Sequence, residues 1–559
     1  MSGLQESGPQ IEQAIAVKTW SDVAKPDEAQ RMAEQESRAK WFARLFVPGA
    51  VYAVFYTIFT YQNDRGIGIF LWIAATAAYA CYVMHAEAIS LKRGSGALLT
   101  VMGLLGLSTI LTSNDWLIAC NHYGFCLLLL YFLLVQTRDT SGWSIWEAAS
   151  GMFLAVIGAI GKIWAPFTEG YSWLRLHAQT RNKRCSDEQI NKRHSTVLGV
   201  LISIPVLLFL ASLLMSADAV FKSMMSYFTF TWTLSADAIG AGFTFLFGLF
   251  AAYCGMRHIL EQKNGSAAAA QKKYSVITAQ IVTGAVLVLY VWFCLVQAVY
   301  LFGGFGTLPD GMTYAQYART GFFQLLFVCI LNLFLVLTVR RCFENAKALT
   351  LSLCGICLCS YVMTASSAYR MILYIQAYHL TVLRVVVLVA LATIAVLLAG
   401  VMMHVFNEKF RILPYFVAVV SIVYTLYSFS NAERLVVRYD LTYMTENNAD
   451  GILSYISGLS LDALPEVVSF LEQAEDGYAA DVRNKLQTVC KTYDVQVGEH
   501  MFDYLHPDDE TYGWFVQWLG YNRAALSDQS PMSWNLATSH AKDMLNDFLR
   551  STDEQSTDS

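Results

Sequence analysis

The sequence has few charged residues for its length. Asp, Glu, Lys and Arg make up 14% of its 559 residues, whereas a soluble protein of this size carries about a quarter. The deficit is concentrated in long apolar runs such as 196–215 and 385–403. Each run is close to the ~20 residues that cross the hydrocarbon core of a bilayer. The composition excludes an ordinary soluble protein and predicts an all-α, polytopic membrane protein.

Common enzyme motifs are also absent. The sequence has no glycine-rich phosphate loop followed by lysine, no H-E-x-x-H and no serine nucleophile elbow. Cys354, Cys357 and Cys359 imitate the spacing of metal ligands, but they lie in an apolar run without a neighbouring His or acid, which favours packing. We expect no catalytic residue, no cofactor and no metal site, and the sequence leans toward a non-enzymatic role.

Carboxylates are missing from the centres of the apolar runs. Because ion-coupled pumps usually keep a buried carboxylate, this absence weakens proton- or sodium-coupled transport. The polar residues that do lie mid-run are predicted to be hydrogen-bond partners between helices. They are Asn121, His122, Gln280, Gln297 and Asn332.

Positive charges are clustered in alternate loops. Clusters occur before the first run (Arg38, Lys40, Arg44), at Lys92 and Arg93, and in 175–193, 257–273, 340–347 and 409–411. Short loops rich in Lys and Arg face the cytoplasm. The first 40 residues are polar and contain no secretory signal. We therefore expect a bacterial plasma-membrane protein with its N-terminus inside and its C-terminus outside.

This pattern predicts about eleven spans. One apolar segment, 145–166, does not fit, because crossing would place the basic loop 175–193 outside. It also carries Glu147 and Lys162 between terminal tryptophans. We predict a re-entrant or interfacial helix on the cytoplasmic side, and a twelfth span is the alternative. The predicted spans are 45–61, 67–89, 97–112, 116–136, 196–215, 237–256, 275–302, 321–339, 349–368, 384–405 and 413–429.

The chain changes character at Asn431. From there on it has 22 acidic and 8 basic residues, a net charge of −14, against +9 for the rest. Apolar residues recur at helical spacing, Ser460 and Asp462 are predicted helix caps, and Pro465 fits a first turn. We predict a polar cytoplasmic segment (1–44), a transmembrane bundle (45–430), a small helical extracytoplasmic domain (431–550) and a disordered tail (551–559).

Three stretches of the sequence form a distinctive combination. The first is Y-A-R-x-G-F-F, which begins at Tyr317. The second runs from Arg370 to Arg384 as R-M-x-L-Y-x-x-A-Y-x-L-T-x-L-R. The third comprises 431–443, 459–471 and the S-W-N-L segment at 533–536. Together they resemble a bacterial multi-pass membrane family known only as a domain of unknown function, over roughly 195–547. The resemblance implies a topology but no activity.

One departure from that family lies in the second stretch. Ile375, Gln376 and His379 stand where the family commonly has acidic residues and a glycine. If those acids pair with an arginine in the family, this chain lacks the pairing.

Arginines gather near predicted span ends in the first two stretches. His379–Thr381 is predicted to be an outer turn between two helices, which places Arg370 and Arg384 on either side of it. Such arginines can be structural anchors, or they can form an anion-binding rim for a phosphate, a lipid headgroup or a carboxylate. The rim hypothesis names Tyr317, Arg319, Arg370, Tyr374, Tyr378, Thr381 and Arg384.

Three functions stay open on the sequence alone. The leading hypothesis is a non-enzymatic sensor or scaffold that binds an envelope component or lipid through its outer loops and C-terminal domain. The alternatives are a transporter or flippase for an anionic small molecule or lipid, and a membrane-embedded transferase acting on a lipid-linked substrate. The expected partners are the bilayer, an anionic lipid or small anion, and an envelope protein, but no nucleic acid.

Overall fold

All the regular elements of the computed structural model are helices, within the residues it describes. It describes residues 28–140, 142–181, 236–263, 274–298, 322–344, 346–407, 409–445, 448–493, 495, 497–527 and 530–550, with isolated positions between 199 and 221. The predicted span 196–215 and the predicted loop that leads to Arg319 therefore lie outside the described residues, apart from those isolated positions.

Eight helices are long and apolar enough to cross a membrane. The prediction of a multi-pass helical membrane protein is thereby confirmed. Two bent helix pairs raise the possible number of spans to ten within the described part of the chain. The eight are α1 (Glu28–Thr60), α2 (Ile67–Ala86), α4 (Asp115–Thr137), α9 (Ala236–Glu261), α10 (Val276–Gln297), α12 (Phe322–Cys342), α13 (Lys347–Tyr378) and α14 (Val382–Phe406).

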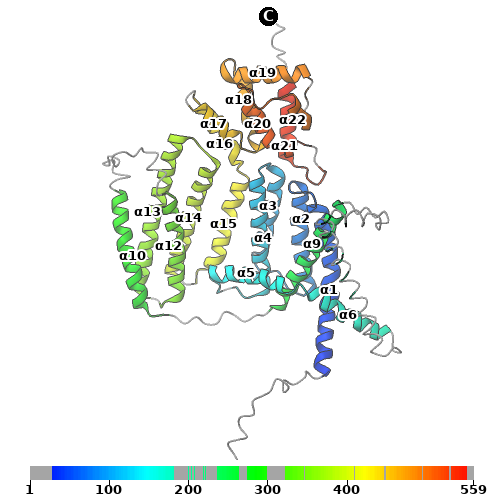
Figure 1. Cartoon of the computed structure of the whole chain (residues 1–559). Helices are drawn as coiled ribbons and strands as arrows, with labels where there is room; N and C mark the ends of the chain where they lie inside the picture. The colour runs from blue at the N-terminus through cyan, green and yellow to red at the C-terminus, as the bar shows by residue number, and fades with distance from the viewer. Residues whose placement is uncertain are drawn as a thin grey trace, which may run out of the picture.

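The bundle is built around two apolar clusters. In Figure 1, α10, α12, α13 and α14 form one group, and α1, α2 and α9 lie on the opposite side of the bundle. Helix α15 (Ile412–Ser428) lies between them and contacts both α14 and α3 (Ser95–Leu111). Many side chains at the periphery are apolar and exposed, as lipid-facing helices require.

Polar side chains inside the bundle hydrogen-bond to one another. Asn332 accepts from the Tyr290 hydroxyl and donates to Ser360, both at 2.8 Å, which joins α10, α12 and α13. Asn121 of α4 accepts from Tyr424 at 2.8 Å and from Ser428 at 3.1 Å, which joins α4 to α15. These contacts confirm the predicted role of Asn121 and Asn332 between helices.

Helix α5 (Ile145–Gly161) runs across the lower end of the bundle in Figure 1 rather than along it. It meets α6 (Ala165–Arg181) at a bend of 52°. Ser144 and Glu147 form a capping box at its start, and Glu147 also pairs with Arg341 of α12. This placement fits the re-entrant or interfacial helix predicted for 145–166.

The C-terminal helices share a hydrophobic cluster and lie together at the upper end of the bundle in Figure 1. Trp518 is fully buried there, and its indole N–H donates to the Leu459 carbonyl at 2.8 Å. The predicted helical periodicity is confirmed, and Pro465 lies in a first turn as expected. The elements are α16 (Ala432–Thr442), α17 (Ala449–Ile456), η3 (Leu461–Ala463), α18 (Leu464–Gln473), α19 (Gly477–Tyr493), η4 (Glu499–Asp503), α20 (Gly513–Tyr521), α21 (Arg523–Leu526) and α22 (Leu536–Arg550).

Helix α16 belongs with these C-terminal helices rather than with the spans. It is bent by 55° from α15 and contacts α18 and η3. Its sequence, AERLVVRYDLT, holds four charged residues in eleven, a density that suits a helix outside the hydrocarbon core.

Candidate functional site

The structure places most of the predicted rim around one turn. Helix α13 ends at Tyr378 and α14 begins at Val382, so the predicted turn at 379–381 is confirmed. Thr381 precedes α14 in extended conformation and makes no side-chain capping hydrogen bond. Tyr317 and Arg319 lie outside the described residues.

Arg384 is engaged by its own turn. Its guanidinium lies 4.2 Å from the centre of the Tyr374 ring, which packs against Tyr378. It also donates to the carbonyl oxygen of Tyr378 at 2.8 Å and to that of His379, a residue with a φ of +72°. The structure thus brings Arg384, Tyr374 and Tyr378 together, in contacts that the anchoring alternative expects.

Arg370 lies on α13 about one helical turn before Tyr374, and it is buried against α10. It is 6% exposed, and its guanidinium donates to the Gln297 side-chain oxygen at 3.1 Å. The Ser366 hydroxyl donates to the same oxygen at 2.8 Å. Arg370 therefore ties α13 to α10, a contact that involves Gln297 as the predicted interhelical partner.

The turn between α13 and α14 is also bound by the C-terminal helices. The backbone N–H of Leu380 donates to the Asp440 carboxylate at 2.9 Å. The N–H of Val382 donates to the Tyr455 hydroxyl at 2.8 Å. Because Asp440 is only 2% exposed, its carboxylate is a buried acceptor for an otherwise unpaired backbone group at a helix start.

A second set of contacts joins the loop between α3 and α4 to the C-terminal helices. The buried Asp462 carboxylate accepts from the Ser113 N–H and hydroxyl, both at 2.7 Å, and from the Thr112 hydroxyl. Asp462 was predicted to cap its own helix. Ser460 alone caps η3, whereas Asp462 directs its side chain to the loop of the bundle.

Glu433 is the second buried carboxylate of this set. One of its oxygens accepts from the Asn114 amide at 2.5 Å, and the other accepts from the Ser460 N–H at 3.0 Å and from the Ser460 hydroxyl. Asn114 in turn caps α4 by accepting from the Leu117 N–H. Glu433 therefore links the start of α4 to the start of η3.

A third set of contacts involves the segment before α22. The Asn535 amide donates to the carbonyl oxygens of Thr109 and Thr112, both at 2.8 Å, at the end of α3. The N–H of Ile67 donates to the Trp534 carbonyl at 3.0 Å. At Gly66, with φ +77°, an added Cβ would lie 2.2 Å from that same carbonyl oxygen.

We call these three sets the junction. On the C-terminal side it comprises Glu433, Asp440, Tyr455, Ser460, Asp462, Trp534 and Asn535. On the side of the bundle it comprises residues 66–67, 109, 112–114 and 380–382. All three sequence stretches of the third motif contribute to it, and the turn it binds lies inside the second motif.

Burial changes the acidity of the junction carboxyls. It raises the pKa of Glu433 to about 7, against the opposing effect of the Ser460 hydrogen bonds. Burial likewise raises the pKa values of Asp462 and Asp440, although each accepts backbone hydrogen bonds that act in the other direction. The junction thus contains three carboxyl groups whose ionised form is disfavoured by burial.

The junction carboxylates hold two parts of the chain together. The carboxylate oxygens of Glu433 and Asp462 accept hydrogen bonds from donors of the protein itself. Among the described residues, no group of three or more His, Cys, Asp or Glu could hold a metal ion.

Comparison with known proteins gives a family. A family model for a domain of unknown function, DUF4153, matches residues 99–470. The chain belongs to the DUF4153 family. The DUF4153 match begins in α3, earlier than the residue 195 expected from the sequence, and ends in α18, before the S-W-N-L segment. It includes Ser113 and Asp462 but not Asn535. No curated protein and no solved structure matches the chain.

One buried ion pair was not predicted from the sequence. Glu169 of α6 is 4% exposed, accepts from the Tyr253 hydroxyl at 2.5 Å and pairs with Arg257 of α9 at 2.8 Å. The Arg257 guanidinium also lies 4.5 Å from the centre of the Trp41 ring. The only local signal was an acidic residue among the apolar and aromatic side chains of α6, which does not identify its partner.

Proposed function

We propose that the protein is a non-enzymatic sensor or scaffold of the bacterial plasma membrane. In this proposal its C-terminal helices form an extracytoplasmic domain that binds an envelope component. The observation that supports it is the junction, which holds those helices on three separate parts of the bundle through buried polar groups. A change at the domain surface is then transmitted to α2, α3 and α13–α14 as a rigid displacement.

The proposed orientation follows from charge. Helix α5 lies at the end of the bundle opposite the C-terminal helices (Figure 1), and Arg341 pairs with its Glu147. Lys92, Arg93 and Arg411 directly precede α3 and α15 at the ends of these helices that lie away from the junction. By the positive-inside rule, this is the cytoplasmic end. The N-terminus is then inside and the C-terminal helices are outside.

The surface of the C-terminal helices suits a protein partner. Tyrosine is enriched at protein interfaces because it combines apolar area with a hydrogen-bonding hydroxyl. The segment from Asn431 onward also has a net charge of −14, so we expect the partner to present a basic surface. The exposed tyrosines are Tyr443, Tyr478, Tyr493, Tyr504 and Tyr521.

The test is site-specific photocrosslinking in living cells. A photoreactive residue replaces Tyr443, Tyr493 or Tyr521, and Ile277, a 69%-exposed residue of α10, serves as the control position. We expect one discrete crosslinked protein at the tyrosine positions and none at Ile277. That product should be lost when Asp462→Ala disrupts the junction.

Two outcomes would favour the alternatives. If the purified chain in proteoliposomes moves an anionic solute or lipid across the bilayer, the transporter or flippase hypothesis is supported. If it modifies a lipid-linked substrate in the same vesicles, the transferase hypothesis is supported. Absence of crosslinks at all three tyrosines, in cells where deletion of the gene has a phenotype, would contradict the scaffold proposal.

A further inference from the structure

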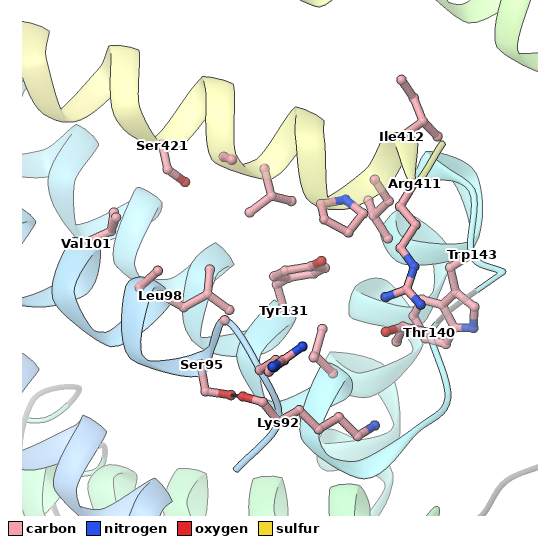
Figure 2. Close-up of a pocket in the computed structure, with 18 of the residues that line it drawn as sticks. Lys92, Ser95, Leu98, Val101, Tyr131, Thr140, Trp143, Arg411, Ile412 and Ser421 are labelled. Atoms are coloured by element: carbon pink, nitrogen blue, oxygen red, sulfur yellow. Dashed lines mark hydrogen bonds between the residues drawn. The ribbon is translucent and has the colours of Figure 1, made fainter. Parts of the chain in front are cut away.

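A cavity lies at the end of the bundle opposite the junction. It has a volume of about 590 Å³ and is lined by the N-terminal halves of α3 and α15, by α4, and by the segment between α4 and α5. Figure 2 shows Arg411 reaching from the start of α15 toward Thr140 and Trp143, with Lys92 and Ser95 on the opposite wall. No residue of the predicted arginine rim lines it.

The charge of the cavity is predominantly positive. Lys92, Arg93 and Arg411 line it together with a single acid, Asp139. Within the described part of the chain, the side chains of Arg93 and Arg411 make no hydrogen bond or ion pair. Lys92 is held in place by donating to the Arg138 carbonyl at 2.6 Å. The guanidinium groups of Arg93 and Arg411 are therefore available to an anion, and the Lys92 ammonium is fixed in the lining of the same cavity.

The backbone adds to this positive potential. Helix α3 begins at Ser95 and helix α15 begins at Ile412, and both residues line the cavity. A helix N-terminus carries about half a positive charge and presents unpaired N–H groups, so it favours anions. Two such ends and three cationic side chains around one space predict that its polar ligand is an anion.

The rest of the lining is apolar. Leu98 and Val101 of α3 and Val417 and Ile422 of α15 contribute apolar side chains to it. Ile422 is 56% exposed on the surface of α15, so this wall continues onto the outside of the bundle. From Ile412 to Ile422 the helix rises about 15 Å, which gives an apolar strip about as long as the hydrocarbon depth of one bilayer leaflet.

Two aromatic side chains are also part of the cavity lining. Tyr131 and Trp143 both line the cavity. Trp143 also lies 6.0 Å from the Arg138 guanidinium. Tyrosine and tryptophan concentrate at the headgroup level of membranes, where a phospholipid changes from charged to apolar.

We infer that this cavity binds one anionic phospholipid. Its phosphate is held by Arg93, Arg411 and Lys92, and one acyl chain lies against the apolar strip between α3 and α15. A free phosphate would satisfy the cations but leave the apolar strip uncovered. The inference is independent of the proposed function, because it concerns the other end of the bundle and no residue of the junction.

Native mass spectrometry of the full-length protein tests the site. The protein is released from nanodiscs that contain equal amounts of phosphatidylglycerol and phosphatidylcholine with matched chains. We expect one retained phosphatidylglycerol and little phosphatidylcholine. The double variant Arg93→Gln/Arg411→Gln should weaken this retention about tenfold, as the loss of two charge-assisted contacts implies.

Three controls separate the possible explanations. Lys347→Gln/Lys491→Gln removes the same charge from exposed positions elsewhere and should leave retention unchanged. Ala418→Trp fills the apolar part of the cavity without altering charge, and it should also reduce retention. Inorganic phosphate at millimolar concentration should not displace the bound lipid. Only variants whose thermal midpoint equals that of the unaltered protein enter the comparison.

Four results would overturn the inference. They are equal retention of the two lipids, equal effects of the two double variants, no effect of Ala418→Trp, and displacement of the lipid by inorganic phosphate. The last would identify a site for small anions instead.

Discussion

The Asp462 carboxylate accepts hydrogen bonds from both the backbone N–H and the hydroxyl of Ser113, each at 2.7 Å, although 349 positions separate the two residues. Ser113 lies in the loop that joins two helices of the bundle, and Asp462 lies in η3 among the C-terminal helices. This pair therefore fixes the position of one part of the chain on another. A buried carboxylate with three donors is a specific connector, because few other side chains could satisfy all three.

Replacing Asp462 with Ala should loosen the C-terminal helices. The change leaves the Ser113 N–H and two hydroxyls without their acceptor, and buried donors without partners cost about 2 kcal/mol or more together. We expect a lower thermal midpoint in detergent and faster tryptic cleavage around residue 431. Asp476→Ala, at an exposed acid between α18 and α19, is the matched control. Equal behaviour of the two variants would show that Asp462 does not hold the junction.

Glu433 should make the junction sensitive to pH. Its ordinary pKa is 4.5, and burial raises it to about 7 in the folded protein. Between these values the folded state binds more protons than the unfolded state, so the free energy of unfolding falls as the pH rises. The difference in thermal midpoint between the protein and Glu433→Gln, measured from pH 4.5 to 8, isolates this effect. The protein should lose stability relative to the variant as pH rises, and a difference of opposite sign would be incompatible with a buried, weakly acidic Glu433.

Arg384 distinguishes anchoring from anion binding. If it is an anchor, Arg384→Ala removes the stacking on Tyr374 and the donors to two carbonyl oxygens, and it should lower stability by about 1–2 kcal/mol. Arg384→Lys should restore only part of the loss, because an ammonium cannot stack as a planar guanidinium does. The thermal midpoint and the amount of protein in the membrane are the measurements. Normal stability with loss of function would instead support the anion-binding rim.

Two glycines with positive φ offer an informative comparison. Gly94 (ψ −11°) is left-handed helical, where alanine costs about 1 kcal/mol, whereas Gly66 (ψ −149°) lies in a region that only glycine adopts readily, so the backbone strain of alanine is larger there. Only at Gly66 would the new Cβ collide with the Trp534 carbonyl, whereas the space beside Gly94 is open. We expect Gly66→Ala to destabilise the protein more and to increase protease access to 530–535. Equal midpoints for the two variants would argue against close packing of this segment on α2.

The sequence was informative where the physics is local. Apolar runs of bilayer length predicted the helices, and the turn at 379–381 was recognised between two of them. The segment 145–166 was set apart because crossing would place the basic loop 175–193 outside, and because it carries Glu147 and Lys162. Helix α1 begins at Glu28, so residues 28–44 of the predicted polar N-terminal segment continue directly into the first span. No pattern in these polar residues predicted that they continue the helix of the first span.

Contacts between distant parts of the chain were not predictable in the same way. Ser460-x-Asp462 fits a helix-capping pattern, and only the tertiary structure shows that Asp462 serves the loop at 112–113. Lys92, Arg93 and Arg411 were identified separately as cytoplasmic cations, but 318 positions separate Arg93 from Arg411. No periodic pattern in the sequence indicates that α3 and α15, the helices that follow these residues, begin next to each other.

Hydrogen exchange of the full-length protein in nanodiscs is the most direct test of the junction. The amides of Ser113, Leu380 and Val382 all donate to C-terminal side chains, although Ser113 and Leu380 lie in loops and Val382 is the first residue of α14. The account predicts slow exchange in peptides covering 109–117 and 378–384, with marked acceleration in 109–117 for Asp462→Ala. Fast exchange of both peptides in the unaltered protein would contradict it, because the C-terminal helices could not then be docked on these loops.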